Sequence, residues 1–357
     1  MDRPCTVPSR DPARRTRSPI GATGTAEVLP ELRARRALSS VGLRPDVALE
    51  PVESVNNEVW MTPDLVVRVS CRPDQRLRRE AQLSQVLPNG VGYPPIRGYG
   101  AEMGSEWLVL GRLSGYPLSR CWPTMGPGDR RQAIRDLADR LRLIHGTQVP
   151  ALPPLRDLPQ LLDPAPSGLM AVARLVVALD RAGRLPHVDR GVTDELGAMV
   201  QRLAWCLEPF TSRTLIHGDL SFENLLWDPR SGRLEAVLDF EWARGAPRDL
   251  DLDVFLRFCA YPDLHVPTSY AAATKADDYR DVPYWLAEDY PELFSAPEQL
   301  DRCRVFSIAW DVEELLAYPP TVGYTKLDAR HPYRRLMAML AGDSHLDRMD
   351  RMSGATA

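Results

Sequence analysis

The sequence predicts an α+β protein with two lobes, a small strand-rich N-terminal lobe and a larger, mainly helical C-terminal lobe. Two observations lead to this fold class. Short β-type runs separated by Asn, Gly and Pro occupy residues 47–113, and apolar residues recur at helical spacing over most of the chain after residue 115. Strands followed by helices typically pack as separate units with a cleft between them, and 357 residues suffice for one large domain or two modest ones.

The N-terminal lobe is expected over residues 25–111, after a basic, disordered tail at residues 1–24. This tail contains five arginines and shows no apolar period. The lobe itself is expected to contain two helices, at residues 26–41 and 74–87, and four strands, at residues 47–52, 58–61, 65–70 and 107–113.

The C-terminal lobe is expected over residues 112–345, followed by a flexible tail at residues 346–357. A strong amphipathic helix begins near Asp129 and ends before Gly146, because glycine commonly terminates helices. Further helices are predicted at residues 170–182, 192–207, 252–260, 300–318 and 333–340. Two apolar strands, at residues 225–227 and 234–238, flank the turn residues 228–232 and predict a β-hairpin.

The composition argues against several classes of protein. A formal net charge of −4 gives no reason to expect a nucleic-acid partner. No apolar run reaches the roughly 20 residues that span a bilayer, and the charged N-terminus lacks the apolar segment of a secretory signal. We therefore expect a cytoplasmic protein without a membrane partner. Six widely spaced cysteines without a C-x-x-C pair predict reduced thiols. A monomer and a dimer both remain open.

Lysine is nearly absent from the chain. Only Lys275 and Lys326 occur among the 44 basic residues. The phosphate-binding loop G-x-x-x-x-G-K-[ST] requires a lysine and does not occur in the sequence. Basic contacts to phosphate before residue 275 must therefore come from arginine.

Residues with the chemistry of phosphoryl transfer gather around the predicted hairpin. Asn224 and Asp239 lie equally far in sequence from the turn, so we expect them to meet at the open end, and Asp219 lies in a glycine-containing loop just before them. Two carboxylates and an amide oxygen form the hard oxygen site that suits Mg²⁺ holding a polyphosphate. A carboxylate that does not bind the metal can orient a hydroxyl and accept its proton.

The run His217-Gly218-Asp219, with Asn224 five residues later and Leu238-Asp239-Phe240-Glu241 downstream, resembles the aminoglycoside phosphotransferase and choline kinase group of protein-kinase-like enzymes. The resemblance covers roughly residues 47–340. It implies a two-lobed protein-kinase-like fold, Asp219 as the catalytic base, and Asn224 and Asp239 as Mg²⁺ ligands. Glu241 stands where a protein kinase has glycine, and we assign it to binding the substrate or assisting the metal.

Two further features follow from the resemblance. His217 is expected to hold the catalytic loop rather than to carry protons. The stretch 245–253 is similar to the family's G-x-P-x-x-D-L pattern, but the spacing is off by one residue. Either Asp249 or Asp251 therefore fills the supporting role.

The nucleotide site is predicted from the same family pattern. Arg68, on the strand at residues 65–70, takes the place of the lysine that grips the phosphates, and Glu80 orients it. Ser54 and Asn56 lie where a loop covers the phosphates, although the glycines of such a loop are missing. The backbone of Gly111 and Leu113 is expected to bind adenine. The implied cofactors are ATP, with GTP as an alternative, and Mg²⁺.

The acceptor is expected to be a hydroxylated small molecule. Residues 261–301 contain nine acidic residues against Lys275 and Arg280, which suits a cationic acceptor, although a solvated acidic surface would have the same composition. We predict an ATP- and Mg²⁺-dependent O-phosphotransferase acting on an aminoglycoside-like antibiotic. Two alternatives stay open: a metabolic kinase for choline, homoserine or a sugar, and a catalytically silent nucleotide-binding protein.

Overall fold

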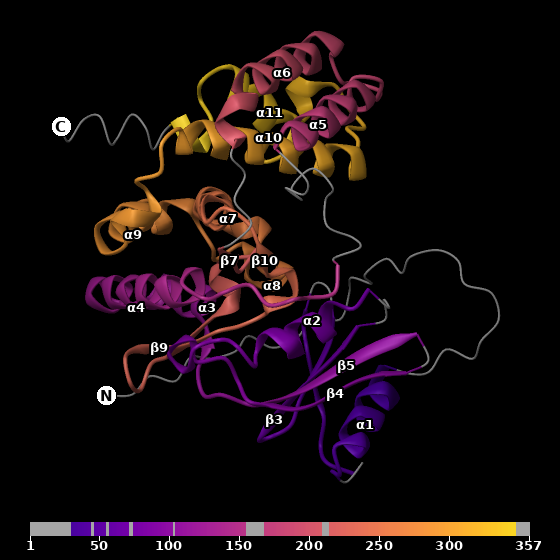
Figure 1. The fold of residues 1–357 in the computed structure, drawn as a ribbon, viewed down its shortest axis with the longest axis vertical. Helices are drawn as coiled ribbons and strands as arrows, with labels where there is room; N and C mark the ends of the chain where they lie inside the picture. Colours follow the sequence, from indigo (N-terminus) through magenta and orange to yellow (C-terminus); the bar gives the residue numbers. More distant parts are fainter. Residues whose placement is uncertain are drawn as a thin grey trace.

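The computed structural model describes residues 30–43, 46–54, 57–70, 74–102, 104–154, 168–208 and 214–347. These residues form a small lobe built on a sheet and a larger helical lobe (Figure 1). The predicted tail at residues 1–24 and residues 348–357 lie outside the described residues. Leu346, which was assigned to a C-terminal tail, is fully buried in the core of the helical lobe.

The small lobe is a five-stranded antiparallel sheet with the strand order β1-β2-β3-β5-β4. Its strands are β1 (Glu50–Val52), β2 (Glu58–Met61), β3 (Leu65–Ser70), β4 (Ile96–Glu102) and β5 (Ser105–Gly111). Helix α1 (Pro30–Ser40) packs on one face against Val67 and Val69, and helix α2 (Arg76–Leu83) packs on the other face. Successive side chains of a strand point to opposite faces, so Arg68 lies on the face of α2.

Strand β4 was not predicted from the sequence. Its residues include Gly98 and Gly100, and glycine is disfavoured in strands. The glycines are needed here because the ring of Trp107, on β5, lies across them. A Cβ atom on Gly100 would come within 2.4 Å of that ring. Packing against a distant aromatic side chain therefore overrides the local preference.

The large lobe contains the helices α3 (Leu118–Cys121), α4 (Pro127–His145), α5 (Gly168–Ala182), α6 (Arg190–Leu203), α7 (Asp249–Ala260), α8 (Thr268–Ala271), α9 (Val282–Asp289), α10 (Gln299–Ala317) and α11 (Pro332–Leu340). Helices α5, α6, α10 and α11 form the part farthest from the sheet, and α4, α7 and α9 lie between that part and the small lobe (Figure 1). Nearly every residue of α7 is buried, so this helix is the centre of the lobe. No helix in the described ranges is long and apolar enough to cross a membrane.

The predicted hairpin is present as β8 (Leu225–Asp228) and β9 (Arg233–Val237), with β6 (Tyr116–Pro117) beside β8. Its register shifts by one residue between Leu226 and Trp227. Leu238 therefore lies opposite Asn224 and donates its N–H to the Asn224 carbonyl at 2.8 Å. Asp239 is the next residue along the strand from the one that lies opposite Asn224. Both residues still lie at the open end of the hairpin.

Candidate active site

The loop that carries Asp219 connects β7 (Leu215–Ile216) to β8, and β7 pairs with β10 (Arg244–Gly245). Gly218 has φ +82°, and a Cβ atom there would lie 2.5 Å from the carbonyl oxygen of Trp242. Only glycine fits this position without strain or collision. The glycine of the His-Gly-Asp run is thus a requirement of the backbone.

His217 ties this loop to the hairpin. Its fully buried ring contacts the Leu238 carbonyl through Nε2 at 2.7 Å, and its Nδ1 accepts the N–H of Asp219 at 3.2 Å. In this arrangement Nε2 donates to the carbonyl and Nδ1 accepts from the backbone. A ring used on both sides in this way holds the loop, as the family pattern implied.

Asp251 also holds this loop in place. Its Oδ2 accepts the N–H of His217 at 2.8 Å, and its Oδ1 accepts the N–H of Gly218 at 2.7 Å. His145, at the end of α4, contacts Oδ2 at 3.2 Å. Burial raises the pKa of Asp251, but the contacts with His145, His217 and Gly218 together outweigh it, so the pKa is lowered.

Asp249, the other candidate for this role, pairs with Arg302 on α10 instead. Its carboxylate makes none of the contacts to the loop that Asp251 makes. Of the two residues that the sequence left open, Asp251 therefore supports the loop that carries Asp219.

Asp219 and Asn224 are in direct contact. Asn224, at the end of the 3₁₀ turn η4 (Phe222–Asn224), donates its Nδ2 to the carbonyl oxygen of Asp219 at 2.8 Å and to Oδ2 at 3.2 Å. This orientation uses the amide nitrogen and leaves the amide oxygen to serve as a ligand. Burial raises the pKa of Asp219, and the negative charge of Asp239 raises it further.

Arg68 joins the small lobe to the end of the hairpin. Its Nη1 contacts both carboxylate oxygens of Glu80, at 2.9 and 2.7 Å, and its Nη2 contacts Asp239 Oδ1 at 2.7 Å. Glu80 is fully buried and also accepts the hydroxyl of Tyr93 at 2.8 Å. The predicted strand arginine and helix glutamate are thus paired, and the same arginine reaches one of the two predicted Mg²⁺ ligands.

Glu241 lies in the turn η5 (Phe240–Trp242), and its side chain is only 1% exposed. It contacts Asn57, Arg68 and Arg76, all from the small lobe. Burial raises the pKa of Glu241 to about 8, and the charge of Asp239 contributes in the same direction. Its contact with a substrate stays a prediction.

Comparison with known proteins gives the family. The profile described as "Phosphotransferase enzyme family" matches residues 49–286. The chain belongs to this family. It is therefore a phosphotransferase of small molecules, and the family and the two-lobed kinase-like fold predicted from the sequence are confirmed.

Three solved structures illustrate the likeness of fold. The aminoglycoside phosphotransferase APH(2'')-Ib, bound to ADP, has 15% identity and a TM-score of 0.55, with 87% of this chain and 97% of that chain covered. A thermostable mutant of APH(4)-Ia with ADP and hygromycin B has 14% identity and a TM-score of 0.53, with 89% and 96% covered. A choline/ethanolamine kinase family protein from Mesorhizobium loti has 17% identity and a TM-score of 0.55, with 89% and 98% covered. No curated protein sequence matches the chain.

The nucleotide-binding positions predicted for this phosphotransferase differ in how far the structure describes them. Ser54 is exposed, and Asn56 lies outside the described residues. The N–H of Gly111 donates to the Pro95 carbonyl at 2.8 Å, so this N–H is already used within the sheet. Of the atoms proposed to bind adenine, the carbonyl of Gly111 and the backbone of the half-buried Leu113 are left.

The residues at the hairpin end fit Mg²⁺ in their chemistry. The ion takes carboxylate and amide oxygens and usually completes its shell with phosphate oxygens and water. Asn224 offers an amide oxygen, and Asp239 offers carboxylate oxygens. Within the described ranges, no group of three or more His, Cys, Asp or Glu side chains is arranged to hold a metal ion.

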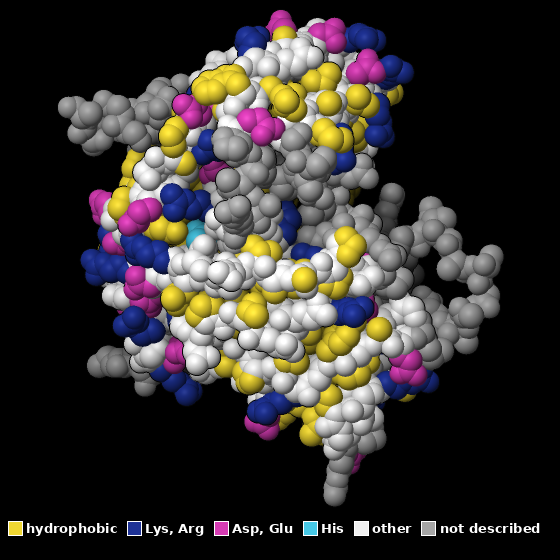
Figure 2. Space-filling view, in the orientation of Figure 1, with side chains coloured by type: hydrophobic (Ala, Val, Ile, Leu, Met, Phe, Trp, Pro, Cys, Tyr) yellow, Lys and Arg dark blue, Asp and Glu magenta, His cyan; other side chains and the backbone are white. Residues whose placement is uncertain are grey.

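Arginines offset much of the negative charge of the acidic stretch at residues 261–301. Seven of its nine acidic side chains form ion pairs with arginines, among them Glu288 and Asp289 with Arg131 on α4. Figure 2 shows basic and acidic side chains interspersed over α4 and α9. An acidic wall facing an acceptor is therefore a weaker argument than the residue count implied.

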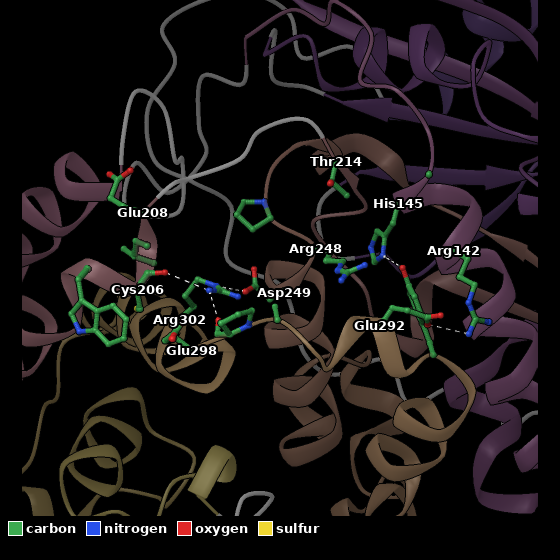
Figure 3. Close-up of a pocket in the computed structure, with 17 residues that line it drawn as sticks. Arg142, His145, Cys206, Glu208, Thr214, Arg248, Asp249, Glu292, Glu298 and Arg302 are labelled. Atoms are coloured by element: carbon green, nitrogen blue, oxygen red, sulfur yellow. Dashed lines mark hydrogen bonds and ion pairs between the residues drawn. The ribbon is translucent and has the colours of Figure 1, made fainter.

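A cavity of about 640 Å³ lies in the large lobe between the end of α4, the start of α7 and the start of α10 (Figure 3). Its lining carries both signs of charge, from Glu208, Asp249, Glu292 and Glu298 and from Arg142, Arg248 and Arg302. Asp219, Asn224 and Asp239 are not among the residues that line it. The cavity reaches the loop that carries Asp219 only indirectly, because His145 lines it and contacts Asp251.

Proposed function

We propose that this phosphotransferase moves the γ-phosphate of ATP to a hydroxyl group of a small molecule in a Mg²⁺-dependent reaction. The observation that carries the proposal is the convergence of Asp219, Asn224, Asp239 and Arg68 at the open end of the hairpin. Asp219 belongs to a loop fixed from two sides, by His217 and by Asp251.

In the proposed reaction, the acceptor oxygen forms a bond to the γ-phosphorus while the bond to the β–γ bridging oxygen breaks, which yields ADP and a phosphate ester. Asp219 orients the hydroxyl and accepts its proton. Arg68 contacts the phosphate oxygens through its planar guanidinium. Asn224 and Asp239 would hold the Mg²⁺, which stabilises the charge on the phosphates when bound.

For the acceptor, we propose an aminoglycoside-like antibiotic. The support is the likeness of fold to enzymes whose structures contain streptomycin or hygromycin B. The pairing of seven acidic side chains with arginine instead favours a less cationic acceptor, such as an amino alcohol or a sugar, as the second candidate.

The test is an acceptor panel with the purified protein, ATP and Mg²⁺. We expect a phosphorylated product with at least one aminoglycoside, other antibiotic, amino alcohol or sugar, and loss of that product in Asp219→Asn. Asp180→Asn, a change at an exposed carboxylate on α5, serves as the matched control and should leave turnover intact. Nucleotide binding without any turnover would instead support the catalytically silent alternative.

A further inference from the structure

Glu241 ties the two lobes together beside the candidate site. Its Oε2 accepts a hydrogen bond from Asn57 Nδ2 at 2.9 Å and contacts Arg68 Nη2 at 3.2 Å. Its Oε1 pairs with Arg76 Nη1 at 3.2 Å. Because these three donors come from separate segments of the small lobe, one carboxylate of the large lobe fixes all of them.

Arg76, the first residue of α2, contacts two consecutive residues of the turn η5. Besides its pair with Glu241, its guanidinium lies 4.9 Å from the centroid of the Trp242 ring. Asp74 orients it through an ion pair to Nε at 2.6 Å. The arginine is only 4% exposed, so these partners hold it in one position.

The charges around this contact make the arginine important for an anionic ligand. The cluster contains two guanidiniums, Arg68 and Arg76, and four carboxyl groups, those of Asp74, Glu80, Asp239 and Glu241. Replacing Arg76 by a neutral residue removes one of the two positive charges from this cluster. A more negative cluster repels phosphate more strongly, and buried charges are poorly screened.

We propose that Arg76 is a positioning residue for the nucleotide. Together with Glu241 it holds Asn57, which belongs to the segment predicted to cover the phosphates, and Arg68, the predicted phosphate contact. We call Asn57, Arg68, Arg76 and Glu241 the interlobe latch. This inference rests on the proposed use of ATP.

The test compares Arg76→Gln with a matched control, Arg257→Gln. Arg257 is equally buried and pairs with the buried Asp311 at 2.7 Å, but both residues lie within the large lobe. Titration calorimetry with ADP and with a non-hydrolysable ATP analogue, with and without Mg²⁺, measures the affinity. Arg76→Gln should weaken binding on the order of tenfold in both conditions, as expected for the loss of one poorly screened charge.

In turnover assays the same variant should raise the KM for ATP by a similar factor, change kcat by less than about threefold and leave the KM for the acceptor unchanged. Arg76→Lys keeps the charge but cannot reproduce the guanidinium contacts with Asp74, Glu241 and Trp242, so it should recover only part of the affinity. If Arg76→Gln does not fold, Asp74→Asn replaces it. That change releases Arg76 from the partner that orients it, and a smaller loss of affinity is expected.

Two results would overturn the inference. One is unchanged nucleotide affinity in Arg76→Gln or, where that variant does not fold, in Asp74→Asn. The other is an equal loss of affinity in Arg257→Gln, which would show a general effect of destabilisation. A wild-type protein that binds no adenine nucleotide would refute the proposed function itself, and this failure is distinguishable because it appears before any variant is made.

Discussion

Replacing Asp251 by asparagine tests how the catalytic loop is held. The fully buried carboxylate accepts the N–H groups of His217 and Gly218 and contacts His145. Asparagine offers one oxygen and an NH₂ group, so one of the two backbone N–H groups must face another donor. Losing a charge-assisted hydrogen bond and leaving a buried amide unpaired together cost about 3 kcal/mol.

The same change should slow the reaction more than it weakens binding. Asp219 follows the two anchored residues directly, so a loosened loop displaces its carboxylate. A displacement of roughly 1 Å costs on the order of a hundredfold in rate. We therefore expect kcat to fall about a hundredfold in Asp251→Asn, with a much smaller change in the KM for ATP.

Asp249→Asn is the matched control because this carboxylate is equally buried, lies two residues away and pairs with Arg302 on α10. Urea unfolding measures the stability of both variants, and steady-state kinetics at a temperature where both are folded measures turnover. Asp249→Asn should lose stability and keep its kcat. The reasoning is refuted if the two variants lose kcat equally, or if Asp251→Asn retains wild-type turnover.

Three further predictions concern the loop, the arginine and the response to acid. In urea unfolding, Gly218→Ala should lower the free energy of unfolding by about 2 kcal/mol, because alanine is strained at a left-handed φ and its Cβ would collide with the Trp242 carbonyl. Gly232 has φ +64° and open space around it, so Gly232→Ala should lose clearly less stability. Arg68→Ala leaves the buried Glu80 without its counter-charge and should lower the free energy of unfolding by about 3–5 kcal/mol. It should also weaken ATP binding in calorimetry. If both the stability and the affinity stay intact, the phosphate contact lies elsewhere. Burial, together with Arg257 and Arg335, lowers the pKa of His265 to about 3 in the folded protein. The unfolded chain takes up this proton already near pH 6.5, so the free energy of unfolding is full above about pH 6.5 and falls as the pH drops toward 3. At pH 4.5 the loss is about 2.5 kcal/mol relative to pH 7, and unfolding of His265→Gln should show a smaller dependence on pH, so an unchanged dependence would contradict the assignment.

The elements with strong local patterns could be predicted from the sequence. Strands β2 and β3 have the expected bounds, and α4 ends at His145, just before the glycine that was expected to stop it. The hairpin was predicted because turn residues separate two apolar runs. The His-Gly-Asp run placed Asp219 in a tight loop, and the structure explains its glycine through a positive φ.

Contacts between distant segments could not be predicted in this way. The choice between Asp249 and Asp251 depends on which carboxylate faces the loop 30 residues earlier, and both have similar neighbours in the sequence. The pairing of the acidic stretch with Arg131 joins residues more than 150 positions apart. Composition shows the number of charges, but only the fold shows which of them are already paired.

The near absence of lysine shapes the chemistry of the small lobe. A lysine at position 68 would bring one compact ammonium group, whereas the guanidinium of Arg68 has two separate terminal nitrogens. One of them contacts Glu80 on α2 and the other contacts Asp239 in the large lobe, so a single side chain spans both sides of the site. Arg68 can make both contacts only while Glu80 and Asp239 stay in place. The neighbouring pair of Glu241 and Arg76 supplies this constraint, because Glu241 contacts both arginines. The substitution of arginine for lysine and the carboxylate that follows Asp239 by two residues are therefore best understood as one arrangement.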